Sequence, residues 1–274
     1  MNEVVSVDWL NKHIKDEKLI LLDASLPKIA GNKSSELDNI TIPGARFFDL
    51  VGNFSDTSSP FPNTMPSEGQ FELECKKLGI NQDSTLIVFD NKGIYSSPRI
   101  WWMFKIMGHD KVSVLDGGLP EWVNKGLNIC KREIKIYELG DFNAHFQKRF
   151  VKRYEDILNN IISDTFTVVD ARSEGRFNGT EKEQRASLKS GNIPNSVNIP
   201  FTKVLENGKF KNPTQLKKIF DTKCSSSKDL IFTCGSGVTA CIILLASELA
   251  YKKSQFVYDG SWTEWAEKQN LKES

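Results

Sequence analysis

The segment Leu230–Ala240 combines a residue type and a setting that suit covalent chemistry. An apolar run typical of a strand ends at Cys234, a loop containing Gly235 and Gly237 follows, and an almost wholly apolar run predicts a helix over 240–250. This order places a thiol at the N-terminus of a helix, where backbone N–H groups and the helix dipole stabilise an anion. Since the thiolate is the nucleophilic form of cysteine, the segment predicts a nucleophile at Cys234.

The loop after Cys234 has the composition needed to surround an anionic sulfur. Two glycines let the backbone turn several N–H groups toward one point, and hydroxyl side chains add further donors. One of these hydroxyls, that of Thr239, could instead cap the helix. Packing as a small buried hydrophobe is the alternative role for Cys234. We predict that the loop consists of Gly235, Ser236, Gly237, Val238 and Thr239.

Two chemistries use a thiolate in such a loop, and the charges separate them. A cysteine phosphatase needs an arginine six positions after the cysteine, but here that position is Ala240, and no residue from 235 to 239 is cationic. A phosphate dianion would lack its charged partner, so phosphatase activity is disfavoured. In sulfur transfer the thiolate attacks a sulfur atom, becomes a persulfide and passes the outer sulfur to a second thiol. Uncharged donors suffice for that anion.

The elements that must position this loop occur twice in the chain. Four pairs of segments match in the same order, and a period this long indicates two homologous domains. The pairs are 19–24 with 166–171, 42–45 with 193–196, 86–90 with 230–234, and 114–122 with 257–265.

Each repeat alternates short apolar runs with helical patterns, which predicts an α/β fold. Near-continuous apolar strands separated by helices indicate a mainly parallel sheet that helices cover on both faces. We expect an N-terminal domain over 1–130, a linker over 131–150 and a C-terminal domain over 151–274. In the first repeat we expect strands at 19–23, 46–48, 86–89 and 112–115, and helices at 7–14, 69–77 and 97–107.

One repeat position indicates which domain carries the chemistry. The first repeat has Asp90 where the second has Cys234, and the following loops differ as well. Only the second domain therefore offers a thiol at the end of this strand. We expect the C-terminal domain to be catalytic and the N-terminal domain to be a non-catalytic partner.

The bulk properties exclude several functional classes. The 274 residues suit two domains, and a net charge of +1 without a basic run argues against nucleic-acid binding. The longest apolar run is too short to span a bilayer. Five widely spaced cysteines without a C-x-x-C pair argue against a zinc site and suggest a reducing, cytoplasmic setting. We interpret Cys75, Cys130, Cys224 and Cys241 as packing residues.

With this loop and this repeat, the chain resembles the two-domain rhodanese-like sulfurtransferases, and among them the mercaptopyruvate subfamily. Thiosulfate-specific members typically have basic residues directly after the cysteine, where this chain has Gly235 and Ser236. The resemblance implies two rhodanese-like domains, with 3-mercaptopyruvate as the sulfur donor. It also implies a thiol acceptor such as thioredoxin, with cyanide as a surrogate, and no metal or organic cofactor. The matching motifs are 234–239, 170–177, 192–200 and 259–265.

The resemblance also assigns roles to residues outside the loop. Arg176 and Arg185 match the family's substrate-binding arginines, which suits bidentate pairing with a carboxylate. Arg172 is expected to be structural. The family usually has a histidine before the Met-Pro of its interdomain segment, and this chain has Asn63 there. Asparagine can hydrogen-bond a substrate but cannot shuttle a proton. A thiosulfate sulfurtransferase and a non-enzymatic persulfide carrier are the two alternative functions.

Overall fold

The computed structural model describes residues 2–27, 35–183, 185, 188–224, 227–251 and 255–273. The chain forms two compact units, which divide between Gln147 and Lys148. Each unit also takes in a short segment from elsewhere in the sequence: Asn207–Phe210 joins the first unit, and Ser58–Thr64 joins the second. The charged segment 131–147 lies in the first unit.

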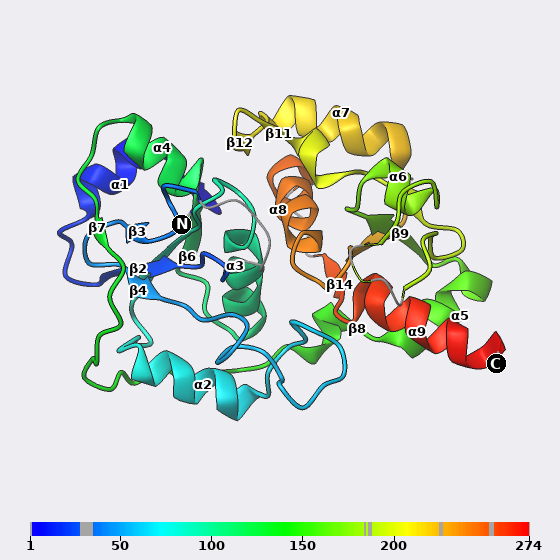
Figure 1. The fold of residues 1–274 in the computed structure, drawn as a ribbon, viewed down its shortest axis with the longest axis horizontal. Helices are drawn as coiled ribbons and strands as arrows, with labels where there is room; N and C mark the ends of the chain where they lie inside the picture. The colour runs from blue at the N-terminus through cyan, green and yellow to red at the C-terminus, as the bar shows by residue number, and fades with distance from the viewer. Residues whose placement is uncertain are drawn as a thin grey trace. The chain divides into compact units, whose positions relative to one another are not determined.

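The first unit contains a five-stranded parallel sheet (Figure 1). The strand order is β1-β6-β5-β2-β4, and a separate pair joins β3 to β7. Its strands are β1 (Val4–Val5), β2 (Leu19–Asp23), β3 (Ile40–Thr41), β4 (Arg46–Phe47), β5 (Thr85–Phe89), β6 (Val112–Leu115) and β7 (Cys130–Lys131). Its helices are α1 (Val7–His13), α2 (Glu68–Lys77), α3 (Ser97–Ile106) and α4 (Gly118–Asn124).

The second unit repeats this sheet with the same order, β10-β9-β13-β14-β8 read from the opposite edge. Its strands are β8 (Val151–Lys152), β9 (Phe166–Asp170), β10 (Val197–Asn198), β11 (Leu205–Glu206), β13 (Asp229–Thr233) and β14 (Phe256–Tyr258), whereas β12 (Lys209–Phe210) falls in the segment assigned to the first unit. Its helices are α5 (Tyr154–Ser163), α6 (Glu174–Phe177), α7 (Pro213–Lys223), α8 (Ala240–Tyr251) and α9 (Ser261–Glu273), with short 3₁₀ turns η1 (Lys148–Phe150) and η2 (Phe201–Val204). The predicted tandem α/β fold is confirmed.

Helices cover both faces of each sheet, which explains why the central strands are apolar throughout. In the first unit α1 and α4 pack on one face, around Leu10, Ile87 and Trp122. On the opposite face α3 packs against β5 and β6, and Phe71 of α2 contacts Phe104 of α3. A strand buried on both faces loses the alternating pattern of a half-exposed strand.

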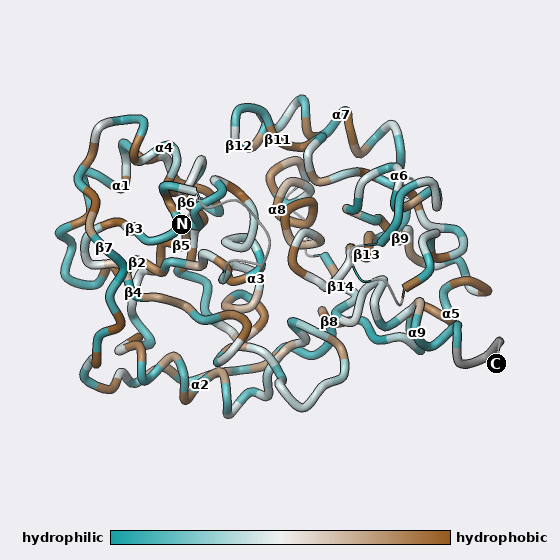
Figure 2. Tube along the Cα trace, in the orientation of Figure 1, coloured by the Kyte–Doolittle hydropathy of each residue, from teal (hydrophilic) through white to brown (hydrophobic). Residues whose placement is uncertain are grey.

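The second unit has the same layers. Helices α5 and α9 lie side by side on one face, where Tyr154 and Trp265 have ring centroids 5.3 Å apart (Figure 1). Helices α7 and α8 cover the other face, and Phe220 of α7 contacts Phe232 of β13. The first eight residues of α8, from Ala240 to Ser247, are all buried, which matches the mainly hydrophobic colouring of this helix (Figure 2). The apolar run that follows the cysteine loop is therefore the inner helix of this unit.

Candidate active site

Cys234 lies at the junction of three elements of the second unit. It follows the last residue of β13, Thr233, and the loop after it leads into α8. The start of α9 holds the cysteine backbone: the Cys234 N–H donates to Ser261 Oγ at 3.3 Å, and the Trp262 N–H donates to the Cys234 carbonyl at 2.9 Å. The Cys234 side chain is buried, with the residue 2% exposed. Hydrogen bonds therefore hold both the N–H and the carbonyl of the residue that carries the thiol.

The loop from Gly235 to Thr239 presents unused donors beside this thiol. In the described part of the chain, no backbone N–H from Gly235 to Ala240 donates a hydrogen bond to another residue. Gly237 has a φ of +79°, which a residue with a side chain adopts only at a cost. Backbone N–H groups in such a glycine-containing turn are available to an acceptor, so this loop can receive an anion.

The equivalent loop in the first unit shows what such donors do when an anion is present. Asp90 follows β5 as Cys234 follows β13, and its carboxylate is fully buried. It accepts hydrogen bonds from the N–H groups of Lys92, Tyr95, Ser96 and Ser97, at 2.9–3.1 Å. The first unit thus fills its loop with its own carboxylate. The second unit has a thiol at that position, and α8 begins one residue sooner after it than α3 does after Asp90.

Arg176 is held against the loop where Gly235 has no side chain. A Cβ atom built on Gly235 would lie 3.0 Å from Arg176 Nη2. Arg176 lies on α6, its side chain is 17% exposed, and its guanidinium pairs with Glu183 at 2.5 Å. A side chain at position 235 would therefore be in tight contact with this guanidinium.

A buried ion-pair network supports Arg176 from behind. Glu183 accepts from Arg176 through Oε2 and from Arg172 through Oε1, the latter at 2.7 Å. The fully buried Arg172 also pairs with Asp170 at 2.6 Å and lies over the ring of Trp262, 4.2 Å from its centroid. Arg172 thus has a structural role, as expected. Sequence reasoning did not identify Glu183, although it lies between the two arginines that the family motif singles out.

Arg185 reaches the same loop by another route. Its side chain donates from Nη1 to Thr263 Oγ1 at 3.0 Å, and Thr263 Oγ1 donates to the Gly235 carbonyl at 2.8 Å. The Thr263 N–H also donates to that carbonyl, at 3.1 Å. Arg185 is exposed. Arg176 thus lies directly against the peptide unit that follows Cys234, and Arg185 is connected to it through Thr263.

Asn63 also lies beside this loop. It belongs to the segment Ser58–Thr64 of the second unit, and its Nδ2 donates to Ser236 Oγ at 3.0 Å. Its φ of +57° lies in the left-handed region, which asparagine tolerates better than most residues. The position expected to carry a family histidine thus holds the side chain of the loop serine.

The other cysteines differ from one another in exposure. Cys241 is buried in α8, with Sγ 3.5 Å from the Gly237 carbonyl, and Cys75 is buried in α2, where burial raises its thiol pKa. Cys224 is half-buried, and burial raises its pKa to about 11. The prediction that Cys130 packs in the core is wrong, because the short strand β7 leaves it exposed.

Among the described residues, no group of three or more histidine, cysteine, aspartate or glutamate side chains could hold a metal ion. No helix within the described ranges is long and apolar enough to cross a membrane.

Replacing Glu183 by glutamine is expected to destabilise the second unit and weaken donor binding. The change removes the charge that neutralises two arginines, one of them fully buried, and breaking a buried ion pair costs roughly 3–5 kcal/mol. Because Asp170 still pairs with Arg172, we expect a loss near the lower end of this range in chemical denaturation. The matched control is Glu181→Gln, since Glu181 is exposed. A Glu183→Gln variant as stable as this control would contradict the network.

Comparison with known proteins identifies the family to which this chain belongs. The family model "Rhodanese-like domain" matches the chain twice, over residues 6–125 and 154–268. The mouse 3-mercaptopyruvate sulfurtransferase is 42% identical over 272 residues, which cover 96% of this chain and 91% of the mouse protein. The rat thiosulfate sulfurtransferase is 40% identical with the same coverage. The crystal structure of the Escherichia coli 3-mercaptopyruvate sulfotransferase SseA superposes with a TM-score of 0.84 at 35% identity, covering 96% of this chain and 99% of that one.

Proposed function

The chain belongs to the rhodanese-like family, and from this premise we propose that it is a sulfurtransferase that takes sulfur from 3-mercaptopyruvate. The observation that carries the proposal is the loop at Cys234. Its donors have no protein acceptor in the described chain, whereas the matching donors of the first unit hold the Asp90 carboxylate. A thiolate or a persulfide anion on Cys234 supplies the missing acceptor.

The first half-reaction loads one sulfur atom onto the enzyme. The Cys234 thiolate attacks the sulfur of 3-mercaptopyruvate, an S–S bond forms, and the C–S bond of the donor breaks. The electron pair of that bond goes to the carbon skeleton as an enolate, which takes up a proton and leaves as pyruvate. Cys234 then carries a persulfide, and the loop N–H groups with the hydroxyls of Ser236 and Thr239 stabilise the anion.

The second half-reaction restores the enzyme. A thiolate acceptor attacks the outer sulfur, a new S–S bond forms on the acceptor, and the Cys234 thiolate leaves. No net oxidation or reduction occurs, and this cycle requires no cofactor. Our proposal includes thioredoxin or a small thiol as the acceptor and a reducing, cytoplasmic setting, which the wide spacing and odd number of cysteines support.

The arginines account for the choice of donor. Mercaptopyruvate carries a carboxylate, and the enolate that forms as its sulfur leaves carries a second negative charge. Arg176 lies against Gly235, and Arg185 is linked to the Gly235 carbonyl through Thr263, which supports a role for both guanidinium groups in binding these charges. Thiosulfate-specific relatives supply their cations from the loop itself. Here Arg176 lies where the first such side chain would project.

The test compares two sulfur donors and follows the enzyme mass. We expect kcat/KM to be clearly higher with 3-mercaptopyruvate than with thiosulfate, because the charges come from arginines outside the loop. Mixing the protein with 3-mercaptopyruvate should add the mass of one sulfur atom at Cys234 and release one pyruvate.

Each alternative function predicts a different result in this test. A higher kcat/KM with thiosulfate would identify a thiosulfate sulfurtransferase, an alternative supported by the 40% identity to the rat enzyme. If 3-mercaptopyruvate left the mass of the protein unchanged, a persulfide carrier loaded by a partner would replace the enzyme proposal.

A further inference from the structure

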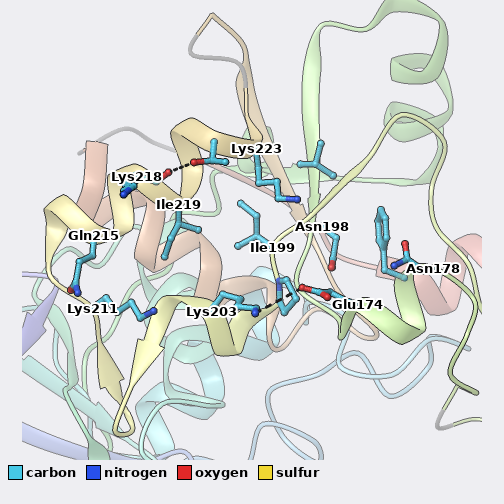
Figure 3. Close-up of a pocket in the computed structure, with 14 residues that line it drawn as sticks. Glu174, Asn178, Asn198, Ile199, Lys203, Lys211, Gln215, Lys218, Ile219 and Lys223 are labelled. Carbon is cyan, nitrogen blue, oxygen red and sulfur yellow. Dashed lines mark hydrogen bonds and ion pairs between the residues drawn. The ribbon is translucent and has the colours of Figure 1, made fainter.

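A second site lies in the C-terminal unit, in a groove that does not include the cysteine loop. The groove has a volume of about 840 Å³ and is bordered by α6, β10, η2 and α7 (Figure 3). Among the described residues that line it, Glu174 is the single acid. Four lysines from η2, α7 and the segment before α7 also line it: Lys203, Lys211, Lys218 and Lys223.

The groove is lined by apolar side chains and by the edge strand of the sheet. Ile199 is buried, and Ile219 of α7 contributes a half-buried side chain (Figure 3). Among the described strands, β10 pairs with β9 alone and so forms one edge of its sheet. The Ile199 N–H donates to the backbone carbonyl of Asp170 in β9 at 3.0 Å. Because alternate residues of a strand point their backbone groups to opposite sides, the N–H and carbonyl of Asn198 point away from β9.

The internal repeat shows which part of the first unit corresponds to this groove. Val197 pairs with Val169 in β9 as Arg46 pairs with Leu22 in β2. Helices α7 and α2 also correspond. Each has a side-chain N-cap, Asn212 or Ser67, and each buries the residues four and eight positions after that cap. In this alignment the groove residue Lys223 corresponds to Leu78, at the end of α2.

In the first unit the corresponding region, between β4 and α2, is covered by a segment of the chain itself. The Arg46 guanidinium donates to the Leu78 carbonyl and lies over the ring of Tyr137, 4.6 Å from its centroid. Three residues later the Gly140 N–H donates to the Lys76 carbonyl of α2 at 2.9 Å. This covering segment has no helix or strand structure of its own from Arg132 to Gln147. The fold therefore already contains one example of an extended segment lying between the edge strand and this helix.

We propose that the groove of the C-terminal unit binds an extended, acidic segment of a partner protein. The repeat supplies the shape of the occupant, and the lysines supply its charge. Lys203 and Glu174 are 4.0 Å apart and both about two-thirds exposed (63% and 66%), so Glu174 neutralises little of the positive charge. Lys218 and Lys223 are five residues apart on α7, a rise of about 7.5 Å. Cations spread over that length match several carboxylates along a chain better than one compact anion.

Fluorescence anisotropy with a labelled peptide tests this site. The probe is a synthetic copy of residues 133–142, the segment that covers the first unit, with Lys135→Glu to make it more acidic. We expect the peptide to bind the full-length protein, with an affinity that falls as salt is added. Neutralising two groove lysines, as Lys218→Gln with Lys223→Gln, should weaken binding at least tenfold.

The matched control neutralises two lysines of the same unit that do not line the groove, as Lys217→Gln with Lys228→Gln. It should bind the peptide as the original protein does. Equal affinity of the groove variant and this control would overturn the proposal, as would no binding of the acidic peptide. A peptide in which Gln and Asn replace the acidic residues should bind more weakly, and equal affinity of that peptide would also overturn the proposal. Complete displacement of the acidic peptide by tripolyphosphate at equal charge concentration would overturn it as well. Sulfur transfer to a small thiol should be unchanged in both variants, which separates this result from the test of the catalytic proposal.

Discussion

Replacing Cys234 by serine is expected to abolish sulfur transfer, lowering kcat/KM by at least about a thousandfold. A serine hydroxyl at this position cannot form the S–S bond on which both half-reactions depend. The loop should keep its structure, because Ser261 and Trp262 bind the backbone of residue 234 and not its side chain. The rate is measured as pyruvate release. Intact mass should show no added sulfur after incubation with 3-mercaptopyruvate.

The matched control for this variant is Cys241→Ser, seven residues further along the chain. Cys241 is buried in α8, and its thiol lies 3.5 Å from the Gly237 carbonyl, a contact that a serine hydroxyl can replace. We expect this variant to retain most of the transfer rate and to gain one sulfur atom. If both variants lost activity equally, the assignment of the nucleophile to Cys234 would be wrong.

Replacing Asp90 by alanine should destabilise the first unit by more than about 4 kcal/mol. The carboxylate is fully buried and satisfies four backbone N–H groups and the Ser97 hydroxyl. Each buried donor left without an acceptor costs roughly 1–3 kcal/mol, and partial relaxation of the loop recovers some of the total. Chemical denaturation followed by tryptophan fluorescence measures the loss.

The control for Asp90 is Asp110→Ala in the same unit. The Asp110 side chain is 85% exposed and makes an ion pair with Lys105 at the surface, so its removal should leave the unfolding free energy nearly unchanged. If Asp90→Ala were as stable as this variant, the loop would not depend on its internal carboxylate.

Most of the fold follows from the sequence because the central strands are buried on both faces. Segments 19–23 and 112–115 are predicted as strands with the bounds of β2 and β6, since a short apolar run between helices has few other structures available. Strand β1 has only two residues, Val4 and Val5, so it carries no periodicity and depends on pairing with β6. Helix α4 begins at Gly118 and contains a proline, so its pattern is weak as well.

The site is predictable only as far as its residues are neighbours in the sequence. The order of strand, cysteine, glycine-rich loop and apolar helix is local, so it identifies Cys234 and the five loop residues without a structure. Thr263 links Arg185 to the loop across 78 residues, and no local pattern marks it. Glu183 is missed for another reason: a single acid between two arginines resembles a surface charge until its burial is known.

The contact between Arg176 and the backbone at Gly235 restricts how donor specificity could change during evolution. A basic residue introduced at position 235 while Arg176 is present would place its Cβ atom 3.0 Å from the guanidinium and add a second positive charge beside it. Loss of Arg176 first would remove one of the two arginines expected to hold the mercaptopyruvate carboxylate. The two substitutions therefore depend on each other, and either single intermediate is expected to be a poorer enzyme for both donors. A change of donor specificity is therefore expected to require coordinated changes at positions 176 and 235.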